Sequence, residues 1–297
     1  MTAADKLKDV TLLFSGIEAP AKEAEILITE TLGISKIQLL TAPPEISSKD
    51  SDYIDLLAAR RLKGEPMHYI IGHVEFHGLR LNVGKGVLIP RPETELMVEE
   101  AIKLIHAAAR QQSLFGAKPA EAQDDSRISI LDLCTGSGCI ALALAHEIGR
   151  AAVIGVDSSE SALSYARRNA EENWIDNVTY LQGDLFGPLD SGSRFDLIIS
   201  NPPYIRSGDI DKLQVEIRKF EPLAALDGGE DGLGFYRRIF REAPGFLKDG
   251  GMLILEAGAE QSDDIRQLAS EAGFSDFGFI RDYAGIERIF IGRILAP

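Results

Sequence analysis

The chain has 297 residues, of which 45% are hydrophobic and 26% are charged, and its formal net charge at pH 7 is -15. This composition is typical of a globular protein with room for about two domains, and no apolar run reaches the roughly 18 to 20 residues of a membrane-spanning helix. We therefore expect no membrane partner and, because no secretory signal opens the chain, a cytoplasmic location. The acidic balance also disfavours a protein that coats phosphate backbones, which needs clustered Lys and Arg.

The beginning of the chain has apolar residues at helical spacing. Leu7, Val10 and Phe14 lie three and four residues apart, and the pattern recurs twice before residue 60. We expect an all-helical N-terminal domain over residues 1–74. A β-hairpin linker is expected over 75–90, where the apolar period changes to two.

From residue 91 to 297 the pattern alternates between strands and helices. After a helix from Pro92 to about Ala109 and a surface excursion over 110–127, seven strands are predicted over Ile128–Leu133, Ala152–Asp157, Val178–Leu181, Phe195–Ser200, Met252–Ala257, Phe274–Ile280 and Glu287–Ile291. The clearest helices between them are Ile140–Ile148, Ser159–Glu172, Phe235–Leu247 and Asp263–Ala272. This alternation predicts an α/β fold with a mostly parallel sheet covered on both faces. The last two strands should be antiparallel, because the link between them is too short for a crossover.

A proline-locked corner, Asn201-Pro202-Pro203-Tyr204, directly follows the predicted strand Phe195–Ser200. Neither proline has an N–H, so the Asn201 side chain and the carbonyls of Asn201 and Pro202 are left to accept hydrogen bonds. Two acceptors beside the ring of Tyr204 would match a planar amide or amine NH2 group. Taken alone, the same four residues also fit a turn that ends a strand.

A glycine loop, Cys134-Thr135-Gly136-Ser137-Gly138, follows the first strand of the predicted sheet and opens a helix. In such sheets, ligands bind outside the carboxyl ends of the strands. Glycines let backbone N–H groups approach a ligand, and the helix N-terminus behind them suits an anionic group. Nicotinamide, nucleotide and methionine-sulfonium cofactors all use such loops, so the loop alone leaves the cofactor open.

Two acidic residues follow the next two strands. Asp157 is placed to accept the hydroxyls of a ribose. Asp184 is placed to meet an adenine amino group while Leu185 covers the ring, although a capped turn explains this second pair equally well. A dinucleotide-binding dehydrogenase would have a third glycine where this chain has Ala141, and no hydride-transfer base is apparent.

Along the chain, the glycine loop is followed by Asp157 for the ribose, Asp184 for the adenine and then the proline-locked corner at residues 201–204, called the amide corner below. This order resembles that of class I methyltransferases that use S-adenosylmethionine, in their amino-methylating branch. The flanking segments resemble one family within it, the peptide chain release factor glutamine methyltransferases (PrmC or HemK family). They are Gly64-Glu65-Pro66, Leu88-Ile89-Pro90-Arg91-Pro92-Glu93-Thr94-Glu95, Phe220-Glu221-Pro222-Leu223-Ala224-Ala225-Leu226 and Leu255-Glu256-Ala257-Gly258. The resemblance covers residues 60 to 297, and the helical head has the length expected of the family.

The resemblance implies a seven-stranded, mostly parallel Rossmann-like methyltransferase sheet with an antiparallel last strand. It also implies methyl transfer to the side-chain amide nitrogen (N5) of the glutamine in the Gly-Gly-Gln loop of class I release factors, with S-adenosyl-L-homocysteine as the other product. The implied cofactor-binding residues are Cys134, Thr135, Gly136, Ser137, Gly138, Asp157, Asp184, Leu185 and Asn201. The implied substrate-binding residues are Asn201, Pro202, Pro203 and Tyr204, of which Asn201, Pro202 and Tyr204 are assigned catalytic roles, with Tyr204 packed against the amide plane.

The head, residues 1–74, would then dock the release factor, and the methyltransferase domain would span 91–297. We expect a monomer with no metal and no direct nucleic-acid substrate. Two other substrates stay open, a glutamine of a ribosomal protein and the amino group of adenine or cytosine in nucleic acid. Arg91 and Glu95 either line the substrate cleft or pair with each other.

Overall fold

The computed structural model describes residues 1–114 and 127–294. Contacts within these ranges group the chain into two compact units, the first made of Met1–His73 with Gln214–Phe220 and the second of the other described residues. The sequence does not anticipate that a short segment far along the chain belongs to the first unit. Within the described ranges, no helix is long and apolar enough to cross a membrane.

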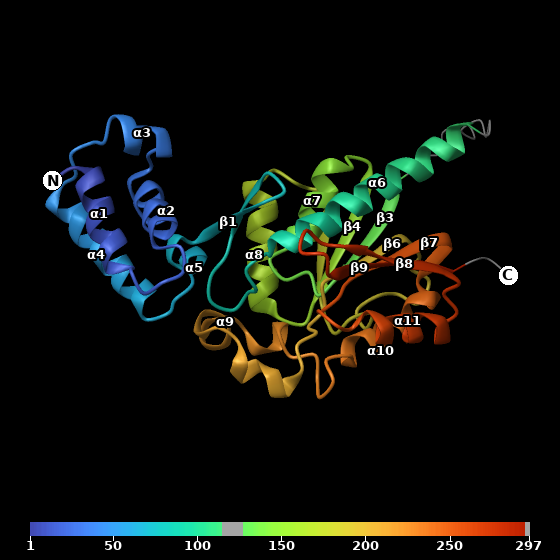
Figure 1. Ribbon diagram of the computed structural model, residues 1–297. Coiled ribbons are helices and arrows are strands. Elements are labelled where there is room, and N and C mark those ends of the chain that lie inside the picture. The colour runs from blue at the N-terminus through green and yellow to red at the C-terminus, as the bar shows by residue number, and fades with distance from the viewer. Residues whose placement is uncertain (115–126, 295–297) are drawn as a thin grey trace. The chain divides into compact units, whose positions relative to one another are not determined.

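The first unit is helical. Its helices are α1 (Ala3–Leu13), α2 (Pro20–Leu32), α3 (Lys36–Thr41), α4 (Ser48–Leu62), α5 (Met67–Ile71) and α9 (Val215–Phe220). The side chains of Thr2, Ser35 and Ser47 cap the first turns of α1, α3 and α4 by accepting backbone N–H groups there. Val10 and Phe14 lie fully inside the core, as their helical spacing predicts. Figure 1 shows helices α1 to α4 in blue and α5 in blue-green.

A buried arginine explains why the segment that contains α9 belongs to this unit. The Arg61 side chain is 4% exposed and pairs with Glu23 of α2 and, at 2.6 Å, with Glu216 of α9. A guanidinium taken out of water needs such carboxylate partners, because an unpaired buried charge is costly. The ion pairs therefore connect α9 to α2 and α4.

The second unit carries the sheet, after a hairpin of β1 (His73–Phe76) and β2 (Leu79–Asn82) and helix α6 (Pro92–Leu114). The sheet strands are β3 (Ile128–Leu133), β4 (Ala151–Asp157), β5 (Val178–Gln182), β6 (Phe195–Ser200), β7 (Leu247–Glu256), β8 (Asp276–Arg281) and β9 (Glu287–Arg293). The remaining helices are α7 (Cys139–Glu147), α8 (Glu160–Glu172), α10 (Gly234–Glu242), α11 (Ser262–Glu271) and the short 3-10 turns η1 (Ser207–Lys212), η2 (Leu223–Ala225) and η3 (Ala243–Gly245).

The strands are ordered β5-β4-β3-β6-β7-β9-β8 in a sheet that has seven strands within the described ranges. β9 is antiparallel to both neighbours, and the other pairings are parallel. Helices α6, α7 and α8 cover one face of the sheet, and α10 and α11 cover the other (Figure 1). The predicted fold class is confirmed, including the antiparallel end.

Three boundaries of the predicted helices and strands differ from the structure by more than two residues. Helix α6 continues to Leu114, and the rest of the predicted surface excursion, residues 115–126, lies outside the described residues. Helix α10 ends at Glu242 instead of Leu247, because Pro244 lacks the N–H that a continuing helix needs. Strand β7 already begins at Leu247, and Gly250 and Gly251 within it interrupt the apolar run from which a strand is predicted.

The central strands bring three predicted segments together. In the parallel register, Leu133 at the end of β3 lies opposite Val156 of β4 and Ser200 of β6. The residues that follow these strand ends therefore meet at one edge of the sheet. They are the glycine loop, Asp157 and the amide corner.

Candidate active site

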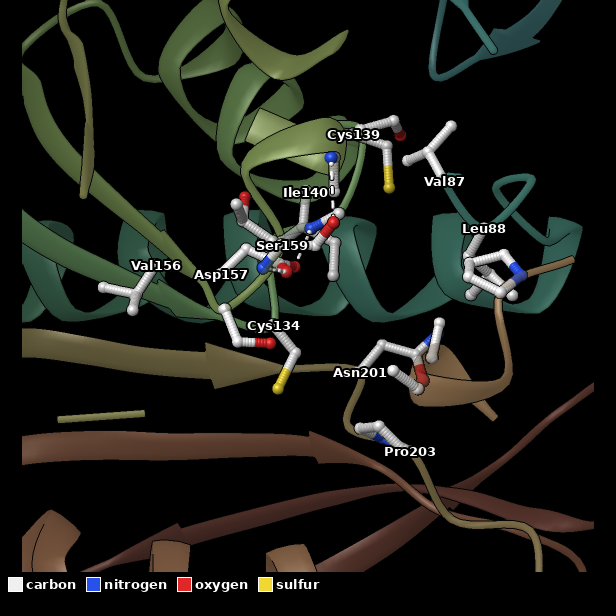
Figure 2. Close-up of a pocket in the computed structure, with 18 of the residues that line it drawn as sticks. Val87, Leu88, Cys134, Cys139, Ile140, Val156, Asp157, Ser159, Asn201 and Pro203 are labelled. Carbon is white, nitrogen blue, oxygen red and sulfur yellow. Dashed lines mark hydrogen bonds between the residues drawn. The ribbon is translucent and has the colours of Figure 1, made fainter. Parts of the chain in front are cut away.

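A pocket opens at this edge of the sheet (Figure 2). It is lined by most of the predicted site residues, namely Cys134, Thr135, Gly136, Ser137, Asp157, Asp184, Leu185, Asn201 and Pro203. The stretch between the hairpin and α6 adds Val87, Leu88, Pro90 and Arg91 to the lining, and the first turn of α6 adds Thr94. Gly138, Pro202 and Tyr204 do not belong to the lining, so the structure gathers cofactor and amide residues in one cavity but leaves these three beside it.

The glycine loop has a tightly wound backbone. Gly136 and Gly138 adopt positive φ values of 55° and 81°. A Cβ on Gly138 would lie 2.6 Å from the Tyr180 hydroxyl oxygen, so only glycine fits there without displacing that side chain. The neighbouring Cys134 also lines the pocket, but burial raises the pKa of its thiol far above neutral pH, which makes it an unreactive lining group.

Asp157 is held by backbone groups. Its Oδ2 accepts the N–H of Gly136 at 2.8 Å, and its Oδ1 accepts the N–H of Ser159 at 2.9 Å. Burial raises the pKa of Asp157, while the backbone N–H groups favour its charged form. Because a carboxylate has about four acceptor positions, both oxygens can accept one further hydrogen bond from a ligand.

Asp132 is the last residue but one of β3, and the sequence does not indicate a role for its carboxyl group. It is completely buried, and its Oδ2 accepts from Thr135 Oγ1 at 2.5 Å and from the Ala141 N–H at 3.1 Å. Its Oδ1 has no hydrogen-bond partner among the described residues. Burial raises the pKa of Asp132 to about 7. The only sequence feature that could have pointed to Asp132 is the presence of an acid inside a mostly apolar strand.

The predicted adenine-side residues differ in their surroundings. Asp184 is exposed, and its Oδ2 accepts from Arg238 on α10 at 2.8 Å. Leu185 is buried with a positive φ of 51° and presents an aliphatic side chain to the pocket. The carboxylate keeps acceptor capacity beyond its ion pair, so a ligand amino group can still be bound there.

The Asn201 side chain belongs to a hydrogen-bonded chain. Its Nδ2 donates to Thr94 Oγ1 at 3.2 Å, and Thr94 Oγ1 donates to Glu256 Oε2 at 2.6 Å. The Tyr204 hydroxyl donates to the other carboxylate oxygen of Glu256 at 3.3 Å. The hydroxyl of Tyr204 therefore bonds to Glu256, and packing of its ring against a substrate amide stays a prediction.

Gln261 and Gly228 contact the backbone of the amide corner. Gln261 Nε2 donates to the carbonyls of Tyr204 at 3.1 Å and Gly232 at 3.3 Å. A Cβ on Gly228 would lie 2.8 Å from the Tyr204 Cα and 2.9 Å from the Pro203 carbonyl oxygen. This close approach of two backbones requires glycine at 228 and limits movement of the corner.

Arg91 lines the pocket and pairs with Glu221. Its Nη2 donates to both carboxylate oxygens of Glu221, at 2.7 and 2.8 Å. The Glu221 side chain is 1% exposed. Of the two alternatives for Arg91, the structure thus gives a pocket-lining position with a partner other than Glu95. The ion pair connects the stretch before α6 to the stretch before η2, and both line the pocket.

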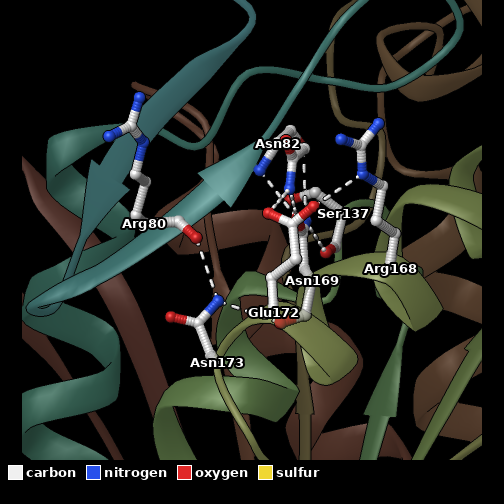
Figure 3. A network of polar contacts seen from close by, with 7 residues as sticks. All are labelled: Arg80, Asn82, Ser137, Arg168, Asn169, Glu172 and Asn173. Atoms are coloured by element: carbon white, nitrogen blue, oxygen red, sulfur yellow. Dashed lines mark hydrogen bonds and ion pairs between the residues drawn. The ribbon is translucent and has the colours of Figure 1, made fainter. Parts of the chain in front are cut away.

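A buried amide connects the hairpin to the glycine loop (Figure 3). Asn169 of α8 is 0% exposed, and its Nδ2 donates to the carbonyls of Ser137 at 3.0 Å and Asn82 at 3.2 Å. Its Oδ1 accepts the backbone N–H of Asn82 at 2.6 Å. One side chain therefore sets the position of the glycine loop relative to β2, a role that no motif in the sequence indicates.

Known families match both parts of the chain. The family described as the PrmC N-terminal domain matches residues 7–72, and the one described as a methyltransferase domain matches residues 124–275. In solved structures, the chain resembles the hMettl16 catalytic domain with a TM-score of 0.51 and 13% identity over 84% of this chain and 83% of the other. It also resembles human methyltransferase 10 domain containing protein with a TM-score of 0.50 and 14% identity over 84% and 100%. At these identities the likeness supports the fold alone.

Curated relatives match over nearly the full length. The chain is 42% identical over 291 residues to a release factor glutamine methyltransferase of Thermodesulfovibrio yellowstonii, with 98% of each protein covered. Proteins of the same name from Geobacter sulfurreducens, at 42% identity with 94% of this chain and 91% of that protein covered, and from Vibrio cholerae, at 39% with 98% and 96% covered, also match. The chain therefore belongs to the release factor glutamine methyltransferase family.

Proposed function

We propose that this protein transfers a methyl group from S-adenosylmethionine to the side-chain amide nitrogen (N5) of the glutamine in the Gly-Gly-Gln motif of class I peptide chain release factors. The observation that carries the proposal is the shared pocket, in which the glycine loop and Asn201 line one cavity. Full-length similarity to relatives named for this substrate supports it. S-adenosyl-L-homocysteine and the proton lost by the amide nitrogen would be the other products.

The residues present fit the cofactor. Asp157 keeps acceptor positions suited to the ribose hydroxyls, and the loop from Cys134 to Gly138 offers a close-packed backbone at the start of α7. We assign cofactor binding to this loop and to Asp157, Asp184, Leu185 and Asn201. When bound, the cofactor supplies a sulfonium-activated methyl group.

The chemical difficulty lies in the substrate, because the lone pair of an amide nitrogen is delocalised into the carbonyl. Acceptors on both N–H bonds stabilise the positive charge that grows on this nitrogen during transfer. We assign these acceptors to Asn201 Oδ1 and the Pro202 carbonyl oxygen. Pro203 lines the pocket beside them, and we assign it a substrate contact.

We assign docking of the release factor to the helical head, residues 1–74, because a loop glutamine must be presented by a large folded body. Large apolar side chains are exposed on its helices, including Leu12 on α1 at 77% and Ile37 on α3 at 74%. The net charge of -15 favours a protein substrate over nucleic acid. We also propose that the protein acts as a cytoplasmic monomer.

The direct test of this function is a labelling experiment. The purified protein is incubated with methyl-labelled S-adenosylmethionine and, separately, with class I release factor, a large-subunit ribosomal protein and DNA. We expect label only on the release factor, and mass spectrometry should place one methyl group on the glutamine of its Gly-Gly-Gln motif. Label on the ribosomal protein or on DNA, with an unlabelled factor, would overturn the proposal.

The docking role of the head has a separate test with a double variant, Leu12→Glu and Ile37→Glu. If the factor docks on these exposed side chains, we expect kcat/KM for intact release factor to fall by about tenfold or more, since interface anchors often contribute over 1 kcal/mol each. Activity on a short peptide with the Gly-Gly-Gln motif should not change. Tyr283→Ala, at a side chain that is 90% exposed in the second unit, is the matched control. Equal losses on factor and peptide would contradict docking at these positions.

A further inference from the structure

We propose that Thr94 and Glu256 are positioning residues that orient the Asn201 amide, so that its oxygen and not its NH2 group faces the substrate. The inference rests on the proposed function, because it concerns the acceptor assigned to the substrate amide. Neither residue needs to contact the reacting atoms, since each acts through Asn201.

The three side chains come from distant parts of the sequence. Thr94 lies in the first turn of α6, Glu256 is the last residue of β7, and Asn201 directly follows β6. Thr94 is 1% exposed and Glu256 2% exposed, so water does not compete for the hydrogen bond between them. They form a chain that runs from the Asn201 Nδ2 to Thr94 Oγ1 through a partly buried hydrogen bond, and from Thr94 Oγ1 to Glu256 Oε2 through a buried one.

The direction of this chain follows from the number of hydrogens available. A threonine hydroxyl has one hydrogen, and an ionised carboxylate can only accept. When Thr94 donates its hydrogen to Glu256, its oxygen has only lone pairs left for Asn201. The Asn201 NH2 group must then turn toward Thr94, because the opposite orientation would place two acceptor oxygens against each other. This leaves Asn201 Oδ1 for the substrate.

Several contacts support Glu256 as the acceptor that sets this direction. Two hydroxyl groups converge on it, from Thr94 at one oxygen and Tyr204 at the other. The Thr94 distance of 2.6 Å lies in the range of hydroxyl-to-carboxylate hydrogen bonds, which are roughly twice as strong as neutral ones. Burial raises the pKa of Glu256, while the hydrogen bond from Thr94 and the charge of Arg288 favour its charged form. Tyr236 Oη fixes the main chain there by donating to the Glu256 carbonyl at 2.7 Å.

The experiment compares Glu256→Gln, Thr94→Val and Thr94→Ser with the wild-type protein. A glutamine at 256 can donate to Thr94, which releases the hydroxyl hydrogen toward Asn201 and lets the amide turn its NH2 group to the substrate. Valine removes the hydroxyl with little change in shape, whereas serine keeps it. We expect kcat on release factor to fall roughly 10- to 100-fold in the first two variants and to stay within a few-fold in Thr94→Ser, as for residues that orient functional ligands.

Two further measurements separate positioning from a structural role. The Kd for S-adenosylmethionine, from calorimetry, and the thermal unfolding midpoint should stay near the wild-type values in Thr94→Val. Wild-type kcat in Thr94→Val, or a loss of cofactor affinity and folding that parallels the loss of kcat in both Thr94 variants, would overturn the inference. Failure of the proposed function would be a different result, namely no methylation of the factor by the wild-type protein.

Discussion

Replacing Asn201 with alanine is expected to lower kcat for release factor methylation by roughly 100- to 1,000-fold, the loss typical when one preorganised group that stabilises transition-state charge is removed. Asn201 lines the pocket, and its amide is held by Thr94 at 3.2 Å. Alanine removes the acceptor for one substrate N–H, so the charge that grows on the nitrogen is no longer stabilised there. The Kd for S-adenosylmethionine should change by less than about tenfold, because the glycine loop and Asp157 are intact.

Single-turnover kinetics with release factor and calorimetry with the cofactor would measure the two effects separately. The matched control is Gln267→Ala, which removes a surface amide that donates to Glu271 at 2.8 Å on α11. It should leave both quantities unchanged. If Asn201→Ala lost cofactor affinity in proportion to kcat, cofactor binding would account for the whole effect of Asn201 and the acceptor role would be wrong.

Replacing Asp132 with asparagine is expected to remove a pH-dependent loss of stability. The pKa of Asp132 is about 7 in the folded protein, against an ordinary value of 3.8. Between these two values the unfolded chain binds fewer protons than the folded one, so the free energy of unfolding falls as pH rises. The stability that Asp132 contributes while it is protonated is fully present below pH 3.8 and is lost as the pH rises to about 7. A pKa shift of about three units corresponds to about 4 kcal/mol in the free energy of unfolding.

Urea unfolding of the wild type and Asp132→Asn between pH 4 and pH 8 would measure this difference. The variant should gain stability relative to the wild type as pH rises, because asparagine carries no charge into the buried site. Asp263→Asn changes a side chain that is 99% exposed and serves as the matched control, whose stability should follow the wild type. Parallel curves for the wild type and Asp132→Asn would exclude a buried, titrating Asp132.

The central strands could be predicted well from the sequence. β3 and β6 begin and end at the predicted residues, because strands buried on both faces are almost continuously apolar. The start of β7 was missed, since Gly250 and Gly251 interrupt its apolar run. A Cβ on Gly251 would lie 2.9 Å from the Phe195 carbonyl oxygen, so the close approach of β6 requires a residue that weakens the strand signal.

The position of β9 could not be predicted in the same way. Its short link to β8 predicts an antiparallel pair, and that pair is present. Its pairing with β7 on the other side is also antiparallel, but no feature of the sequence indicates that these two strands are neighbours. Which strand fills the place between β7 and β8 depends on packing across the whole sheet and not on local periodicity.

For the site, the sequence alone determined which groups occur at the strand ends: the glycine loop, Asp157 and the amide corner. Local patterns suffice there because parallel strands deliver their carboxyl ends to one edge. The orientation of Asn201 depends on the folded structure instead, since Thr94 lies 107 residues away from it, and Glu256 lies 162 residues from Thr94. A hydrogen-bond direction depends on which donors and acceptors meet in space, and neither period nor spacing in a single chain encodes that meeting.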